Sequence, residues 1–174
     1  MSRIRGKDTT PEMVVRSLLR RLGYRFRLHV RIPVILSAST GERKKGEVSK
    51  KSLSRACRAE ASERRLVTRH LSPRFVCPDI FLPKYKTAIF VHGCFWHRHR
   101  GCKNCTTPTH RRDWWLKKLE GNAARDKLHQ RALRKLGWRS IVIWECETEK
   151  LKKLVRLQTR LERILSAAKD RKGL

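Results

Sequence analysis

The sequence predicts an α/β fold in which a mixed β-sheet is flanked by helices. Three observations indicate this class. Helical patterns lie near both ends of the chain, short apolar runs typical of buried strands lie between them, and the elements follow the order helix, three strands, helix, strand, helix. We expect one domain over residues 1–174.

The first predicted helix begins after Thr9 and ends at Gly23. Thr9 and Glu12 have the spacing of a capping box, Pro11 suits the first turn, and glycine is common just beyond a helix end. Its apolar stripe consists of Met13, Val14, Leu18, Leu19 and Leu22. Residues 24–30 then alternate between apolar and polar, which predicts a half-buried strand.

Residues from about 33 to 76 differ from their surroundings. They are rich in Lys, Arg and Ser and poor in aromatics, so we expect a mobile insertion with a marginal helix over 52–66. Two interpretations stay open: an additional arm that contacts nucleic acid, or an insertion without function.

Regular structure is predicted again from Cys77 onward. The sequence indicates a hairpin whose second strand is residues 86–92, a loop over 100–112, a long helix over 113–135, a buried strand over 139–144, and a closing amphipathic helix over 147–168.

Charge points to a polyanionic partner. Lys and Arg number 44 against 15 acidic residues, which gives a formal net charge of +29. Such an imbalance favours nucleic acid, bound in a salt-dependent way. The sequence has no stretch of 18 apolar residues and no signal-peptide pattern, so we expect a cytoplasmic protein without membrane contact. In that compartment the six cysteines are metal ligands or inert thiols rather than disulfides.

A zinc site is predicted after the second strand of the hairpin. Cys94, His99 and Cys102 lie within nine residues, and Cys146 follows a distant strand. Four such ligands would make a closed tetrahedral site. Cys94 and Cys146 could instead be small buried hydrophobes, and Cys105 could replace Cys102 because the two form a CxxC pair.

Hydrolytic chemistry is predicted at the same strand end. Asp79 precedes one strand of the hairpin, while the other strand carries His92 and is followed by His97. A carboxylate can hold Mg²⁺ beside a phosphate, and an imidazole can accept a proton from water. Glu12 could supply a second carboxylate. The alternatives are a turn role for Asp79, a capping role for Glu12, and surface histidines.

Two adjacent aromatic pairs have the composition of a DNA wedge. Phe95-Trp96 and Trp114-Trp115 lie near basic residues and could insert between base pairs. Ordinary packing is the alternative, above all for Trp114 and one loop aromatic. We expect Trp138 and Trp144 in the core.

Taken together, PDIFLPKYKTAIFVHGCFWHRH, WWLKKLEGNAARD and LGWRSIVIWECE resemble the very short patch repair (Vsr) DNA mismatch endonucleases, and MSRIRGKDTTPE resembles the start of that family's first core helix. The resemblance implies a fold similar to type II restriction endonucleases. It also implies a monomer that nicks double-stranded DNA on the 5′ side of the thymine in a T·G mismatch, in association with a bacterial nucleoid.

The resemblance also implies roles for individual residues. Asp79 and the Val91 carbonyl would bind Mg²⁺, His97 would be the general base, and His92 and Glu12 would complete the active site. Zinc would be held by Cys94, His99, Cys102 and Cys146, and the intercalating residues would be Phe95, Trp96 and Trp115. The alternatives are a zinc-bearing DNA-binding module without catalysis and a related nickase with another DNA target.

Overall fold

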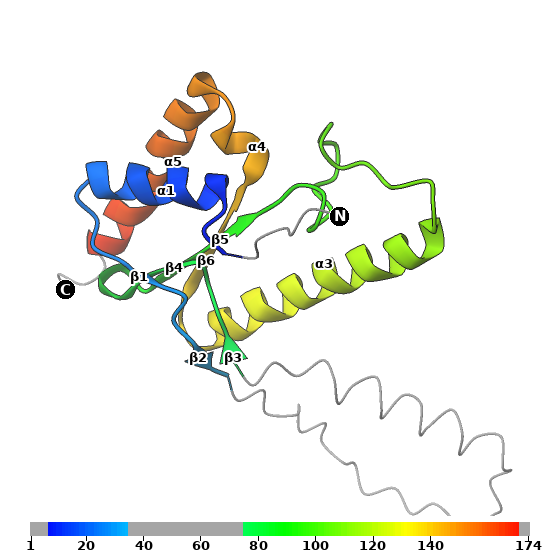
Figure 1. The fold of residues 1–174 in the computed structure, drawn as a ribbon. Coiled ribbons are helices and arrows are strands. Elements are labelled where there is room, and N and C mark those ends of the chain that lie inside the picture. Colours follow the sequence, from blue (N-terminus) through cyan, green and yellow to red (C-terminus); the bar gives the residue numbers. More distant parts are fainter. Residues whose placement is uncertain (1–6, 35–74, 171–174) are drawn as a thin grey trace, which may run out of the picture.

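The computed structural model describes residues 7–34 and 75–170 (Figure 1). The helices are α1 (Thr10–Arg21), α3 (Arg112–Lys135), α4 (Glu145–Thr148) and α5 (Leu151–Asp170), with a short 3-10 turn η1 (Pro83–Tyr85). The strands are β1 (Arg27–Leu28), β2 (Ile32–Pro33), β3 (Phe75–Val76), β4 (Ile80–Leu82), β5 (Thr87–His92) and β6 (Arg139–Trp144).

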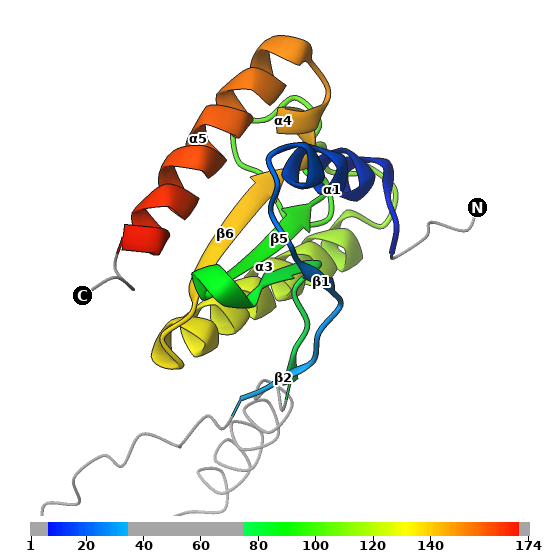
Figure 2. The ribbon, with the colours of Figure 1, turned by 90° about the vertical axis from the view of Figure 1, so that its left-hand side faces the viewer.

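The main sheet has the strand order β1-β4-β5-β6 (Figure 2). β4 pairs antiparallel with both β1 and β5, whereas β5 and β6 are parallel over six residue pairs from Thr87↔Arg139 to His92↔Trp144. The parallel pair needs a crossover connection, which α3 supplies. The predicted mixed sheet is therefore confirmed.

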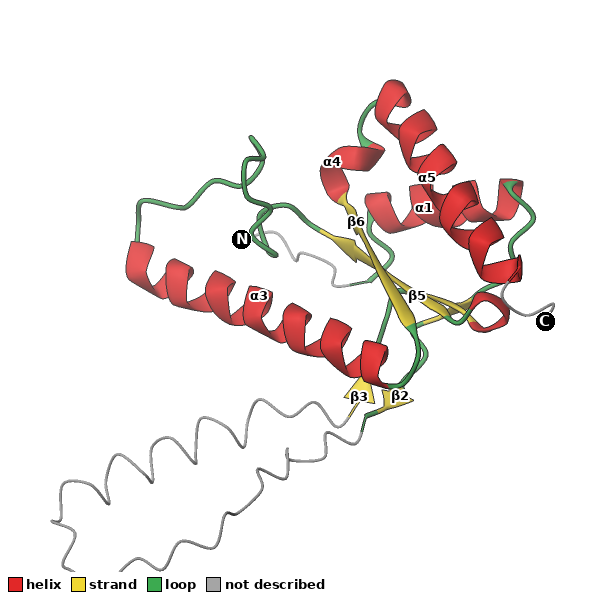
Figure 3. Ribbon diagram, turned by 180° about the vertical axis from the view of Figure 1, so that it is seen from behind, coloured by secondary structure: helices red, strands yellow, loops and turns green. Residues whose placement is uncertain are grey.

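Helices cover both faces of this sheet (Figure 3). Successive side chains of a strand point to opposite faces. Ile80, Leu82 and Ile89 accordingly pack with α1 and α5, while Phe81 and Phe90 pack on the side of α3. The resulting cores lie on either side of the sheet and hold its strands at fixed positions.

Two predicted elements differ from the structure. Of the predicted strand 24–30, only Arg27–Leu28 pairs, because its neighbour β4 is itself three residues long. Tyr24 and Phe26 still pack against the first core, which explains the alternating pattern. The closing helix is divided into α4 and α5. Across the part of the chain that the structure describes, no helix is both long and apolar enough to cross a membrane.

The predicted insertion lies mostly outside the described residues. Its two ends are described, and they pair antiparallel as β2 and β3 with Ile32 opposite Val76. Val34 and Val76 are both buried in the second core. Residues 33–34 and 75–76 thus belong to the folded domain, and the predicted helix over 52–66 is outside the described range.

Candidate active site and metal centre

The carboxyl ends of the parallel strands β5 and β6 bring the predicted functional residues together. His92 ends β5 and is paired in register with Trp144, which ends β6. The loop 93–111 follows the first strand, and α4 with Cys146 follows the second. Ligands and catalytic groups commonly gather at this edge of an α/β sheet.

Asp79 reaches the neighbouring strand from its position just before β4. The Val91 N–H donates a hydrogen bond of 2.8 Å to Asp79 Oδ2. Burial raises the pKa of Asp79, the Val91 hydrogen bond opposes this rise, and the nearby Glu12 adds to it. Among the described residues, Oδ1 of Asp79 has no donor, so one carboxylate oxygen is available to a cation.

Glu12 is buried in a network that the sequence did not reveal. Its Oε2 accepts hydrogen bonds from the Arg16 guanidinium at 2.9 Å and from the Asp8 N–H at 3.1 Å. Its Oε1 accepts one from the Thr9 hydroxyl at 2.9 Å. The predicted capping box is therefore wrong in its bonding, because Thr9 binds the Glu12 carboxylate instead of a helix N–H.

A guanidinium occupies the centre of this acidic cluster. Arg16 is only 3% exposed and also pairs with Asp8 and contacts His29 Nε2 at 3.2 Å. Because the guanidinium can only donate, His29 accepts with Nε2. Although Asp8, Glu12 and His29 lie close enough to hold a metal ion, Arg16 already supplies the positive charge.

His97 pairs with an acidic residue that the sequence did not single out. Its Nδ1 lies 2.6 Å from Asp126 Oδ2 on α3. An ionised carboxylate can only accept here, so Nδ1 carries a proton, and Nε2 is the ring nitrogen left to interact with a ligand or water. Asp126 is in mid-helix, and no local pattern singled it out.

His92 packs against the His97 ring of this pair. The His92 and His97 rings stack at 3.9 Å between centroids, with an angle of 7° between their planes. Burial, aided by the nearby His97, lowers the pKa of His92 to about 4. At neutral pH His92 is therefore an uncharged group that packs against His97 rather than a cation.

All four predicted hydrolytic residues line one cavity of about 610 Å³. Besides Glu12, Asp79, His92 and His97, its walls include Asp126, Arg125, His129, Phe95 and Trp96. Arg125 adds a guanidinium that the sequence analysis missed. Carboxylates, a base and aromatic rings thus surround a single space that is large enough for a phosphodiester and water.

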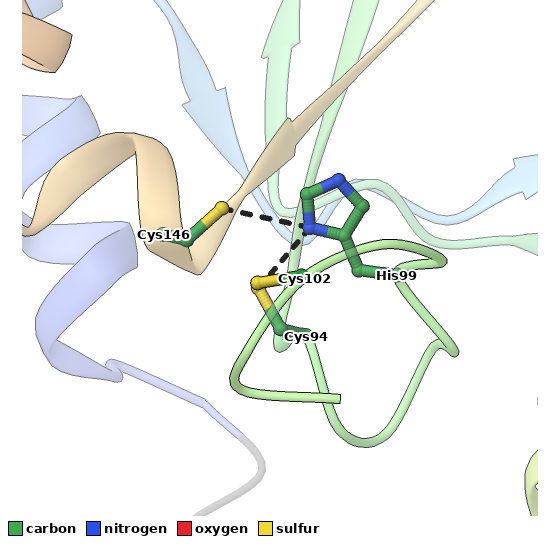
Figure 4. Close-up of side chains that lie close together, drawn as sticks. All are labelled: Cys94, His99, Cys102 and Cys146. Carbon is green, nitrogen blue, oxygen red and sulfur yellow. Dashed lines mark hydrogen bonds between the residues drawn. The ribbon is translucent and has the colours of Figure 1, made fainter. Parts of the chain in front are cut away.

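The predicted zinc ligands also converge. Candidate ligand atoms of Cys94, His99, Cys102 and Cys146 all lie within 4.8 Å of one another. His99 Nδ1 is 3.4 Å from the Cys94 sulfur and 3.5 Å from the Cys146 sulfur (Figure 4). Cys105 is not a member of this cluster, so the geometry selects Cys102 between the two predicted alternatives.

The surroundings of this cluster suit a metal. Burial raises the pKa of the Cys94 thiol to about 12, and a bound divalent ion would hold its sulfur as the thiolate. Trp144 stacks on the His99 ring at 4.1 Å with a 3° interplanar angle. Trp144 is half-buried beside the cluster, so its predicted core position is wrong.

The aromatic residues form one continuous group. Phe95, Trp96 and Trp115 contact one another with centroids 5.1–5.9 Å apart, and all three are half-buried. Trp114 meets Trp115 edge to face at 4.9 Å but is 54% exposed, so a core position for Trp114 is excluded. Trp138, also expected in the core, is half-buried and packs against the second core cluster, with its ring 4.5 Å from that of Phe81.

Comparison with known proteins gives a family match. A family model described as DNA mismatch endonuclease Vsr matches residues 46–104, part of which lies outside the described ranges. The chain is 37% identical over 165 residues to the type II nicking enzyme V.XorIIP of Xanthomonas oryzae pv. oryzae, covering 95% of the chain and 88% of that protein.

Two further relatives bear on the family. The type II nicking enzyme V.NmeAIP of Neisseria meningitidis serogroup A is 32% identical over 98% of the chain and 89% of its own length. The DNA mismatch endonuclease Vsr of Escherichia coli K12 is 40% identical over 44% of the chain and 49% of its own length. The chain therefore belongs to the Vsr family of DNA mismatch endonucleases, and it is a DNA endonuclease.

Proposed function

We propose that this protein is a Mg²⁺-dependent endonuclease that nicks DNA on the 5′ side of the thymine in a T·G mismatch, as a step in repair of deaminated 5-methylcytosine. The observation that carries the proposal is the single cavity shared by Asp79, the His97–Asp126 pair and the aromatic residues Phe95 and Trp96. We further propose a fold similar to type II restriction endonucleases, action as a monomer, and association with the nucleoid through DNA.

Asp79 is the residue that we assign to Mg²⁺ binding, together with the main-chain carbonyl of Val91. Hard oxygen ligands suit Mg²⁺, which binds through few protein ligands and keeps several waters. The Val91 N–H binds Oδ2 of Asp79, and Asp79 lines the cavity. When bound, Mg²⁺ would neutralise charge that develops on the phosphate during hydrolysis.

His97 is the general base in this proposal. Its Nε2 accepts a proton from the attacking water, while Asp126 holds the ring orientation and stabilises the imidazolium that forms. His92 remains neutral and supports the His97 ring by stacking. Glu12, held by Arg16 and Thr9, adds negative charge near Asp79 and can hydrogen-bond a water in the cavity.

Phe95, Trp96 and Trp115 form the wedge that opens the duplex. Phe95 and Trp96 line the cavity and contact Trp115, so in this proposal the unstacked step would adjoin the scissile phosphate. Unstacking costs a few kcal/mol per step and is least costly at a mismatch, which gives selectivity. The loop that carries two of these rings is held by Cys94, His99 and Cys102, for which we propose Zn²⁺ as the structural ion.

A second candidate function has support of its own. The two relatives that align over almost the whole chain are both named type II nicking enzymes, while the mismatch endonuclease of E. coli aligns over 44% of the chain. A nickase with a different DNA target is therefore the alternative. A DNA-binding module without catalysis is less well supported, because His97 and Asp126 pair at 2.6 Å in the cavity that Asp79 also lines.

Nicking assays separate these functions. Duplexes that differ only in T·G against T·A at one position are incubated with the protein and Mg²⁺, and Asp79→Ala serves as the inactive control. We expect T·G-selective nicking that Asp79→Ala abolishes while duplex binding persists. Equal nicking of both duplexes supports the alternative nickase, and binding without nicking supports the DNA-binding module.

A further inference from the structure

A second cavity lies on the other side of the histidine pair. It has a volume of about 730 Å³, and it shares three wall residues, His92, His97 and Asp126, with the active-site cavity. We propose that this cavity binds a backbone phosphate of the DNA duplex, distinct from the phosphate that is cut. The proposal rests on the proposed function only in taking DNA as the substrate.

Helix α3 contributes lining residues to both cavities, from different parts of its surface. Ala123, Ala124, Lys127 and Gln130 line the second cavity, whereas Arg125 and His129 line the active site. Residues three and four apart share one helix face, so these are two adjacent faces of one rigid element. Ala123 and Ala124 line this cavity together with Val142 and Trp144 of β6, and a larger apolar side chain at Ala123 would take up part of the space.

Three cations line this second cavity. Arg98, Arg100 and Lys127 contribute positive charge, against Glu120 and Asp126. The Asp126 carboxylate is already paired with His97 in the wall of the cavity. Guanidinium groups match phosphate oxygens in pairs of hydrogen bonds, and ammonium groups add a compact charge.

The loop that carries the two arginines is held in place. Arg98 and Arg100 flank His99 of the metal cluster, and the His99 N–H donates to the Cys94 carbonyl at 3.0 Å. Arg98 itself has a left-handed backbone with φ of 56°. The arginines are therefore presented from a fixed turn, which reduces the entropy lost when they bind a phosphate.

The charge and the position of the second cavity indicate which ligand it binds. The chain carries a net charge of +29, and the cavity adjoins the site of a DNA endonuclease across one wall. A duplex that presents one phosphate to Asp79 has further phosphates of its backbone close by. A cavity lined by two alanines and three cations fits one of them.

Binding measurements test this proposal in the Asp79→Ala background, so that no cleavage interferes. Equilibrium binding of a T·G duplex is measured over a salt series for Lys127→Gln, for Arg98→Gln combined with Arg100→Gln, and for Arg131→Gln. Arg131 is the matched control because it is an exposed cation on α3 that lines neither cavity.

We expect the double arginine variant to raise Kd about 10-fold or more, as for a lost charged hydrogen bond. Its slope of log Kd against log salt should fall by about 1, as expected for one lost phosphate contact. Lys127→Gln should act in the same direction, and Arg131→Gln should change Kd less than either. Equal effects of all variants would overturn the proposal, because they would show only general electrostatics.

A steric variant tests the cavity itself. Ala123→Leu keeps every charge but adds a larger side chain to the lining of the second cavity. It should therefore weaken binding and lower the salt slope as the double arginine variant does. Thermal melting and metal content check that it folds. A folded Ala123→Leu protein with unchanged duplex affinity would overturn the proposal. These outcomes do not depend on nicking, so failure of the proposed function remains distinguishable.

Discussion

Removal of the Asp126 charge tests the mechanism at the contact that the sequence did not reveal. Asp126→Asn keeps the side-chain volume but replaces the carboxylate that lies 2.6 Å from His97 Nδ1. The amide can still contact the ring, yet it no longer requires the proton on Nδ1 and no longer stabilises the imidazolium.

The size of the effect follows from this contact. A hydrogen bond to a charged group contributes about 1.5–3 kcal/mol, and each 1.36 kcal/mol is a factor of about 10 in rate. The His97 and Asp126 side chains are 27% and 17% exposed, so solvent screens the pair only partly. We therefore expect the single-turnover nicking rate to fall about 10- to 160-fold, while Kd for an uncut duplex stays nearly unchanged.

A double-mutant cycle provides the control. If Asp126 acts through His97, Asp126→Asn should have little further effect on the residual rate of His97→Ala. The reasoning is refuted if Asp126→Asn leaves the rate of the otherwise intact protein unchanged, or if it lowers the rate equally with and without His97.

Further predictions concern the metal cluster, Asp79 and Arg16. Cys146→Ser should lose most of the bound zinc and have a lower melting temperature, whereas Cys105→Ser should keep its zinc and its melting temperature. Elemental analysis and thermal melting measure these two quantities, and equal behaviour of the two variants would contradict the ligand set. Burial raises the pKa of Asp79, so the folded state disfavours the ionised carboxyl. The protein therefore loses stability as pH rises from the ordinary pKa of an aspartate to the raised pKa of the folded state. Asp79→Asn should therefore abolish nicking without lowering the melting temperature at neutral pH, and a clear loss of stability would contradict this. Arg16→Met leaves Glu12 as an unpaired buried charge, so denaturant titration should show a loss of about 3–5 kcal/mol, and a loss below 1 kcal/mol would refute a structural role for the pair.

Local patterns predicted the parts of the molecule that depend on local chemistry. The apolar run of β5, the helix α1 and the long helix α3 were each recognisable because burial imposes a pattern on the sequence. The predicted apolar stripe of α1 was only partly right, because Met13 is 48% exposed and Val15, which was not in it, is fully buried. Cys94, His99 and Cys102 were also recognisable, because their close spacing in a polar loop indicated a shared ligand. Cys146 could be added because it directly follows another predicted buried strand.

The features that the sequence did not predict depend on tertiary packing. Asp126 and Arg16 lie within helices whose other faces give the dominant pattern, and only the placement of α3 and α1 against the sheet shows what these side chains contact. The short pairing of β1 depends on the length of β4 rather than on residues 24–30. Trp144 looked like a core residue because tryptophan next to a buried strand usually is one, but here it faces His99.

The most direct test of the central claim is to map the nick on two duplexes that carry the thymine of a T·G pair in opposite strands. If the wedge opens the duplex at the mispair and presents the adjoining phosphate to Asp79 and His97, a single nick should appear immediately 5′ of the thymine and should change strand with it. A nick that keeps its strand and position when the thymine is moved would contradict the account.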